Sequence, residues 1–556
     1  MGMHARIQRS VNRFIHKWES VQVELHGHYS IERFAAMNEY CRSASCPRAL
    51  MVLLITPLPS LILVTMIDAM PLESPERGLE HSAIVWVRGI LTCFIYTHCA
   101  IEQIRLYSPN LRLEPLAGLC ISLPTAIFTI VLTLGLSFLC WPLPFTTLLM
   151  SGPWLGFMTF FLFRVRGAHL RANPEAIRDV LRFATICGTQ AAVVLVYAVF
   201  VTIFTNISPT YQPLFALLIP ASKIIQKNVL SRILAGRDDT KPQVVILNVE
   251  IFNALFISTC MRDLQSFNTS ITLIAIDFLQ AAVSLLDLYR MLSDVKIIRD
   301  KLGIRSNELI STAELVLAKY PGTANCPTTT TASSPQFARV FLKKKQVLPT
   351  MNMQVGGYEI PVPVSSLRYA SRASSTYTDK KSSVTPTTSL VKLSSQEHYQ
   401  LLKKTLQVLF LTEFMLLIEF TEVLVPVIYG GYLTILYHFP NRRFYPQLAE
   451  ISDQELWDMV ISVLQYGTLE LVSLTLLVLV LNRLVHPHSL KQLAFVLERE
   501  FFMVQPKLLL WVTMTMQSTL PHLGKKTISI IIETITQKLR LFVYNRGRLQ
   551  LQVCLA

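Results

Sequence analysis

The chain has 556 residues, of which 51% are hydrophobic and only 16% are charged, well below the roughly one quarter usual in soluble domains. This balance excludes an ordinary soluble enzyme and places the chain among membrane proteins. The formal net charge is +15, but no arginine-rich run, RNP-type aromatic motif or zinc-finger spacing accompanies it, so we expect basic cytoplasmic loops and no nucleic-acid partner.

Residues 1–48 form a polar, basic segment without the early apolar run of a cleavable signal peptide. Between positions 14 and 25, apolar residues recur at helical spacing close to Arg9, Arg13 and Lys17. This pattern predicts an amphipathic helix on the inner membrane surface. Cys41 and Cys46 follow, just before the first apolar stretch, and are candidates for palmitoylation, although two unmodified thiols are the simpler interpretation.

Ten apolar stretches follow, each close to the length of about 20 residues that a bilayer core requires. They lie at about 49–70, 83–104, 115–140, 145–163, 184–205, 211–230, 243–261, 269–289, 406–428 and 459–482. The expected fold class is therefore all-α, a polytopic bundle of about ten transmembrane helices. Residues 508–520 are apolar but short, and they are a candidate eleventh or re-entrant span.

Changes in composition divide the chain into five predicted regions. They are a cytoplasmic amphipathic segment (1–48), eight spans (49–290), a cytoplasmic helical extension with a disordered Ser/Thr-rich linker (291–405), a C-terminal transmembrane region with an interfacial helix at 489–504 (406–524) and a basic tail (525–556). Besides the lipid bilayer itself, anionic lipids of the inner leaflet are expected partners of the basic segments.

The distribution of Lys and Arg predicts the orientation. Nineteen of these residues fall in the N-terminal segment, the loops after spans two and four, and the end of span six with its loop, whereas the opposite loops hold only Arg77, Arg262, Arg442 and Arg443. We therefore expect a cytoplasmic N-terminus. The plasma membrane is favoured over an organelle.

Ionisable and amide side chains inside the spans are the best functional lead, because each is costly in lipid and must face protein or water. Asp277, Gln280 and Asp287 share one face of the eighth span at 100° per residue. The other candidates lie in the sixth, seventh, ninth and tenth spans, and they are Lys223, Glu250, Asn253, Glu413, Glu419, Glu422 and Glu470. Asp277, Glu419 and Glu470 lie nearest the predicted midplane.

Three interpretations of these residues stay open. They could line a hydrated cavity that binds a cation or relays protons, with Lys223 or Lys227 as counter-charge. They could instead be protonated acids and amides that hydrogen-bond one helix to another, at about 1 kcal/mol each. Near helix ends, as for Asp287, the side chain could simply extend to the membrane surface. Glu413 points away from Glu422 on a straight helix, so one narrow pore cannot contain both. A kink or break near Pro426 and the following Gly430-Gly431 would change this geometry.

The motifs of common enzyme classes are absent: the sequence has no His-Glu-x-x-His, Gly-x-Ser-x-Gly, P-loop or Rossmann fingerprint. We therefore expect no enzymatic activity, no cofactor and no structural metal. The leading hypothesis is a transporter or channel-like protein for an ion, a proton or a small solute. The alternative is a receptor or scaffold that signals through its cytoplasmic linker.

The last third of the chain carries a recognisable pattern. Its features are the Glu-bearing ninth span with Pro426, the Tyr-Gly-Gly-Tyr sequence at 429–432, Phe-Pro-Asn at 439–441 and the span that contains Glu470. In these features the chain resembles a large group of uncharacterised multi-pass membrane proteins of oomycetes. The resemblance implies a polytopic membrane fold but supplies no activity and no site residue, and it does not extend past Gly524.

Overall fold

The computed structural model describes residues 22–108, 111–143, 146–206, 212–216, 218–263, 267–302, 309–319, 395–445, 448–485, 488–517 and 520–523. These residues form helices and their connections, and no β-strand occurs among them. The predicted linker up to residue 394, the basic tail and the first 21 residues lie outside this part of the chain. The chain divides into two compact units, one of residues 1–290 with 406–556 and one of residues 291–405.

The described chain begins with η1 (Val23–Leu25), α2 (Ile31–Ser43), α3 (Cys46–Ile55) and α4 (Leu58–Asp68). The hydroxyls of Ser30 and Ser45 accept the backbone N–H groups of Arg33 and Arg48, and so cap α2 and α3. Pro57 separates α3 from α4, because it has no N–H to continue the helical hydrogen bonds. Together α3 and α4 cover the first predicted span.

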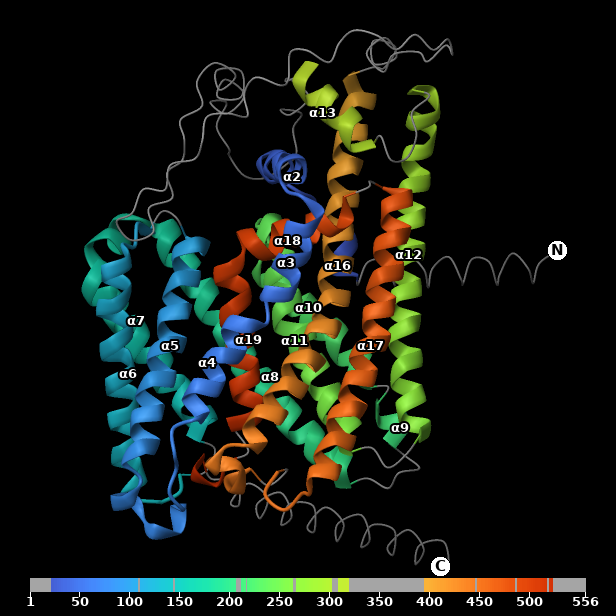
Figure 1. The fold of residues 1–556 in the computed structure, drawn as a ribbon. Helices are drawn as coiled ribbons and strands as arrows, with labels where there is room; N and C mark the ends of the chain where they lie inside the picture. Colours follow the sequence, from blue (N-terminus) through green and yellow to red (C-terminus); the bar gives the residue numbers. More distant parts are fainter. Residues whose placement is uncertain are drawn as a thin grey trace, which may run out of the picture. The chain divides into compact units, whose positions relative to one another are not determined.

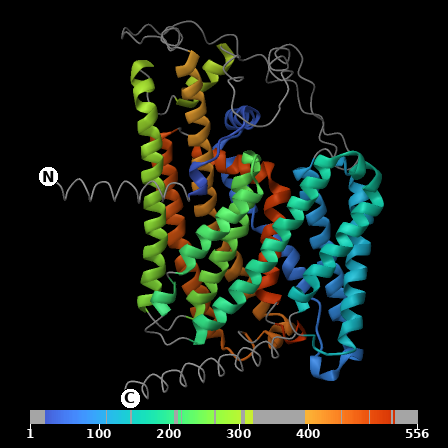
Figure 2. The same ribbon diagram turned by 180° about the vertical axis from the view of Figure 1, so that it is seen from behind.

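The next three helices are α5 (Ala83–Tyr107), α6 (Pro115–Ser137) and α7 (Thr146–Ala172), which kinks at Arg166. Helix α6 packs between α5 and α7, and the three helices form one group in both ribbon views (Figures 1 and 2). One face of α6 carries buried hydroxyl residues, each bonded to the carbonyl four residues earlier: Ser122, Thr125, Thr129, Thr133 and Ser137. Such small side chains allow membrane helices to approach closely.

The middle of the chain contains α8 (Pro174–Asn206), α9 (Gln212–Ala216), α10 (Leu218–Ile233), η5 (Asp238–Thr240), α11 (Lys241–Asp263), α12 (Phe267–Leu302) and α13 (Leu309–Lys319). The span predicted at 211–230 is thus divided between α9 and α10. Helix α11 packs on α10, α17 and α19, so it lies inside its unit. This position explains why its residues 244–251 are all buried.

The C-terminal part contains α16 (Ser395–Tyr437), η9 (Pro440–Phe444), α17 (Asp453–Leu484), α18 (Ser489–Arg499), α19 (Phe501–Gln517) and η10 (Pro521–Leu523). The expected break near Pro426 does not occur, because α16 continues through Pro426 and both following glycines. The predicted interfacial helix at 489–504 is shorter than expected. Its backbone leaves the helical conformation at Glu500, and α19 starts one residue later.

Four helical segments are long and apolar enough to cross a membrane: Cys46–Asp68, Ala83–Tyr107, Pro115–Ser137 and Asp453–Leu484. Their outer faces expose large apolar side chains, with Met66, Leu116 and Leu476 showing 64%, 69% and 57% of their surface. An apolar exterior of this kind suits lipid and not water. The chain is therefore a helical membrane protein.

Candidate functional site

Two lysines on α10 and one glutamate on α11 form the centre of the candidate site. Lys223 and Lys227 are four residues apart and so share one face of α10. The Nζ atoms of Lys223 and Lys227 lie 3.0 and 2.8 Å from the two carboxylate oxygens of Glu250, which has no exposed surface. This buried group forms where α10 packs on α11 (Figure 1).

The group continues in both directions as a line of alternating charges. Lys227 Nζ also lies 3.0 Å from Oε1 of Glu24 in η1, and Lys223 Nζ lies 3.4 Å from Oε1 of Glu422 in α16. We call these five residues the ion-pair chain. The backbone carbonyl of Leu406 in α16 accepts the N–H of Tyr29. Glu422 follows Leu406 by about 24 Å along the same helix, at a rise of 1.5 Å per residue.

At Glu422 the ion-pair chain meets a group of three acids. Carboxylate oxygens of Glu419, Glu422 and Glu470 all lie within 4.8 Å of one another, and all three side chains are buried. We call these residues the carboxylate cluster. Three carboxylate oxygens at this spacing can hold a hard cation or share protons, because like charges so close cannot all stay ionised alone.

The carboxylate cluster depends on a close approach of α16 and α17. A Cβ atom on Gly467 would lie 3.0 Å from Cβ of Pro426, so only glycine fits there without displacement. Glu470 lies one helical turn beyond Gly467, and Glu422 one turn before Pro426. The contact between glycine and proline therefore sets the distance between the acids of the two helices.

The ion-pair chain and the carboxylate cluster are rich in acids. Together they contain five carboxylates, Glu24, Glu250, Glu419, Glu422 and Glu470, and two lysines. Mutual repulsion between the three acids of the cluster is reduced by protons on some of them or by a metal cation that they share.

Glu413 belongs to a different group of residues. It accepts hydrogen bonds from Tyr29, from Gln243 Nε2 at 2.6 Å and from Arg33 Nη2 at 2.8 Å. Arg33 also reaches Glu500 at 3.3 Å. Burial, and then the Glu413 carboxylate, raise the pKa of Tyr29 well above its usual value, so this hydroxyl remains a donor. These contacts tie α2 to α11 and α16.

The remaining predicted residues whose side chains the structure describes make other contacts or are partly exposed. Asp287 Oδ1 pairs with Arg290 Nη1 at 3.2 Å on its own helix, and Asn253 Nδ2 donates to the carbonyl of Val249 at 2.6 Å. The Gln280 side chain is partly exposed on α12. The side chain of Asp277 lies outside the described part of the structure. The predicted polar face of the eighth span is thus not brought to the cluster by any described contact.

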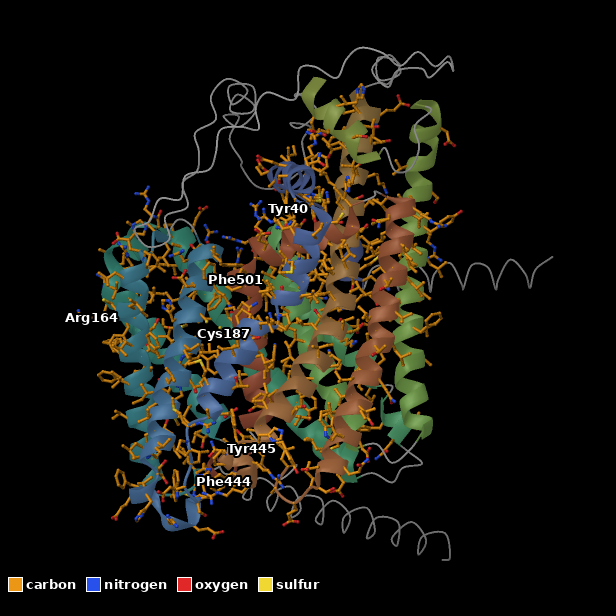
Figure 3. All side chains as sticks on the ribbon, viewed as in Figure 1. Tyr40, Arg164, Cys187, Phe444, Tyr445 and Phe501 are labelled. Atoms are coloured by element: carbon orange, nitrogen blue, oxygen red, sulfur yellow. The ribbon has the colours of Figure 1, made fainter. Side chains whose placement is uncertain are left out.

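Sequence reasoning missed one buried network completely. Asp68, at the end of α4, accepts hydrogen bonds from Arg88, Tyr432 and Tyr445, the last at 2.9 Å. Tyr445 is labelled in Figure 3, near η9. Asn441 Nδ2 donates to the Asp68 carbonyl at 2.6 Å. The sequence did contain a signal: Asp68 lies at the end of the first apolar stretch, and Arg88 lies near the start of the second.

No known protein family, no curated protein and no solved structure matches this chain. The functional argument therefore depends on the geometry of the chain itself.

Proposed function

We propose that this chain is a membrane transporter, or a channel-like protein, that moves a proton, a metal cation or a small solute coupled to one of them. In this proposal the carboxylate cluster of Glu419, Glu422 and Glu470 binds the proton or cation. The observation that carries the proposal is the convergence of these three buried acids within 4.8 Å, beside the ammonium of Lys223.

The ion-pair chain provides the second part of the proposal. Lys223 lies between Glu250 and Glu422, at 3.0 and 3.4 Å. When the carboxylate cluster takes up a proton or a cation, Glu422 attracts Lys223 less, and the lysine shifts toward Glu250. Loading of the cluster would thereby change the packing of α10 against α16, a two-state element of the kind that coupling requires.

The proposal includes the full membrane topology. We propose about ten spans, which adds α7, α8, the α9–α10 pair, α11, α12 and α16 to the four apolar helices, with the N-terminus in the cytoplasm. Three of the added segments, the α9–α10 pair, α11 and α16, carry residues of the ion-pair chain, and within a membrane such residues must face protein or water. Seventeen Lys and Arg residues on one side, leaving out the buried Lys223 and Lys227, against four on the other support this orientation.

The cellular setting belongs to the same proposal. We propose the plasma membrane as the location, inner-leaflet anionic lipid as a partner of the basic segments, and membership of the oomycete group that the last third of the chain resembles. The sequence patterns described above support these points.

Flux in reconstituted vesicles tests the proposal. Purified protein is incorporated into liposomes, and proton entry after an acid jump and uptake of radioactive sodium are measured separately. We expect wild-type protein to support at least one flux, and Glu419→Gln and Glu470→Gln to reduce it at least about tenfold, the effect of losing 1.4 kcal/mol of binding.

The matched control is Asp287→Asn, a buried acid that is not one of the three acids of the carboxylate cluster and that pairs with Arg290 on its own helix. It should keep wild-type flux. Neither flux exceeding that of empty vesicles, or equal flux in wild type and both glutamine variants, would overturn the proposal and favour the receptor or scaffold alternative.

A further inference from the structure

A second polar site lies away from the carboxylate cluster. A cavity of about 300 Å³ is lined by α5, α6, α7, α8 and α19. Its lining includes Cys187 of α8, which is labelled in Figure 3. A volume of this size is at the lower end of the range of pockets that hold small molecules.

Lys507 of α19 lines this cavity and is 95% buried, with 5% of its surface exposed. In the part of the chain that the structure describes, no acid forms an ion pair with it and no group accepts a hydrogen bond from it. A buried ammonium without a counter-charge is costly. Its presence in a cavity indicates that something else supplies the negative charge.

The charged residues of the lining reinforce this point. Among the described residues, the lining contains Arg88 and Lys507 but no aspartate or glutamate. Arg88 is ion-paired through Nη2 with Asp68, which does not line the cavity, while its Nη1 atom has no hydrogen-bond partner among the described residues. The cavity therefore favours an anion and disfavours a cation.

The rest of the wall is suited to an apolar or aromatic body. Tyr96, Trp154, Phe183 and Trp511 all contribute to it. The indole N–H groups already have acceptors, because Trp154 donates to Thr97 Oγ1 at 2.9 Å and Trp511 to the Leu247 carbonyl at 3.1 Å. These two rings therefore need no hydrogen bond from a ligand and can pack against its apolar part.

We infer that this cavity binds a small organic anion, with one carboxylate or similar acidic group paired to Lys507 and an apolar, preferably aromatic, body against the ring-bearing wall. The volume fits a compact single-ring or two-ring acid, or the first part of one fatty acyl chain. None of the residues of the carboxylate cluster lines the cavity. The inference therefore stands independently of the proposed transport function.

The test is ligand-dependent heat resistance of the purified full-length protein in detergent. The probes are naphthalene-2-carboxylate and its neutral and cationic counterparts, naphthalene-2-methanol and naphthalene-2-methylamine. We expect the carboxylate to raise the temperature at which half of the protein remains monodisperse by at least about 2 °C more than either counterpart.

Three variants define the site. Lys507→Gln should abolish the advantage of the carboxylate, and Lys507→Arg should keep it. Ala191→Phe, which fills the cavity from α8, should remove the response to all three probes. The matched control is Lys491→Gln on α18, whose lysine already donates to the Cys41 carbonyl at 2.9 Å and does not line the cavity. It should behave as wild type.

A second assay uses wild-type protein alone, so its result does not depend on whether the variants fold. Because Cys187 lines the same cavity and, unlike the buried Cys41, is partly exposed, naphthalene-2-carboxylate should slow its alkylation by N-ethylmaleimide over hours, read by peptide mass spectrometry, more than the alcohol does. Equal effects of acid and alcohol in both assays, or an undiminished acid effect in Lys507→Gln, would overturn the inference.

The same anionic chemistry could come from a soluble acid or from a membrane lipid. Native mass spectrometry of the purified protein separates the two sources. A fatty acid that is retained by wild type and lost in Lys507→Gln assigns a lipid source. Lipid-free protein that still responds to naphthalene-2-carboxylate assigns a soluble acid.

Discussion

Pro426 of α16 occupies the space beside Gly467 of α17, where any other residue would place its Cβ atom at 3.0 Å from the proline Cβ. This contact lies one helical turn from both Glu422 and Glu470, so the distance between the two helices also sets the distance between their acids. A substitution of Gly467 therefore tests both the contact between α16 and α17 and the spacing of their acids.

Gly467→Ala should push α17 away from α16 and lower the free energy of unfolding by about 1–3 kcal/mol, the usual cost of overpacking. It should also weaken any cation or proton binding by Glu470, since the acids move apart. The free energy is measured by unfolding in a denaturing detergent. Gly431→Ala is the control, because its Cβ would meet only Leu61 Cδ2 at an ordinary 3.7 Å. A stability loss no larger than that of the control would contradict this prediction.

Arg33 and Glu413 provide a test of the buried pair that holds α2 in place. Arg33→Met leaves the Glu413 carboxylate buried without its main counter-charge and should cost about 3–5 kcal/mol. Adding Glu413→Gln keeps an acceptor for Tyr29 and Gln243 but removes the unpaired charge. The double variant should therefore be more stable than Arg33→Met by at least about 1 kcal/mol.

The exposed pair between Arg48 and Glu498 is the control for the buried one. Both of its side chains are more than one third exposed, so Arg48→Met should cost under about 1 kcal/mol. All three variants are compared by unfolding in the same denaturing detergent. Equal losses for Arg33→Met and the double variant would show that the charge of Glu413 is not the source of the cost.

The sequence predicted what depends on local patterns. Apolar length located the spans that became α3–α4, α5, α6 and α17, and the 100° rule correctly separated Glu413 from Glu422 on α16. It could not predict which helices meet. Lys223 is 199 residues from Glu422, and Arg33 is 380 residues from Glu413. No helical periodicity encodes contacts at such separations.

The kink or break expected near Pro426 was wrong as far as a break is concerned, because α16 continues through the proline. Proline removes one hydrogen bond and crowds its own helix, which disfavours a continuous helix. In this fold Gly467 of the neighbouring helix leaves room for the proline ring. Local rules describe a helix alone, whereas this helix is shaped by its neighbour.

Cys41 and Cys46 should differ sharply toward thiol reagents. Cys46 is exposed, whereas Cys41 is buried, and burial raises the pKa of the Cys41 thiol to about 11. At pH 7 only about one Cys41 thiol in ten thousand is then ionised, and the thiolate is the reactive form. A maleimide should label Cys46 within minutes and leave Cys41 largely unmodified in the folded protein, as measured by peptide mass spectrometry.

The pH dependence of the Cys41 reaction has a definite sign. Because its pKa is raised, the thiolate fraction and the labelling rate should increase about tenfold per pH unit from 7 toward 10. Unfolding should remove the difference between the two cysteines. Rapid labelling of native Cys41 at pH 7 would contradict its buried position. If the chain is palmitoylated, the exposed Cys46 is the expected site.

Asp68 links the stability of the bundle to the electrostatics of the cavity. It is fully buried and accepts from Arg88, Tyr432 and Tyr445. Asp68→Asn removes the counter-charge of Arg88 and should cost about 3–5 kcal/mol. Tyr445→Phe removes one hydrogen bond to a charged acceptor and should cost only about 1.5–3 kcal/mol. Unfolding in a denaturing detergent ranks the two variants.

The response to naphthalene-2-carboxylate should also distinguish these two variants, and here Asp68→Asn should show the larger gain in stability. Arg88 lines the cavity, so Asp68→Asn leaves a second cation there without a counter-charge, and naphthalene-2-carboxylate should stabilise this variant more than it stabilises wild type. Tyr445→Phe keeps the Asp68 charge and should respond as wild type does. A weaker carboxylate response in Asp68→Asn than in Tyr445→Phe would show that Arg88 does not contribute to the potential inside the cavity.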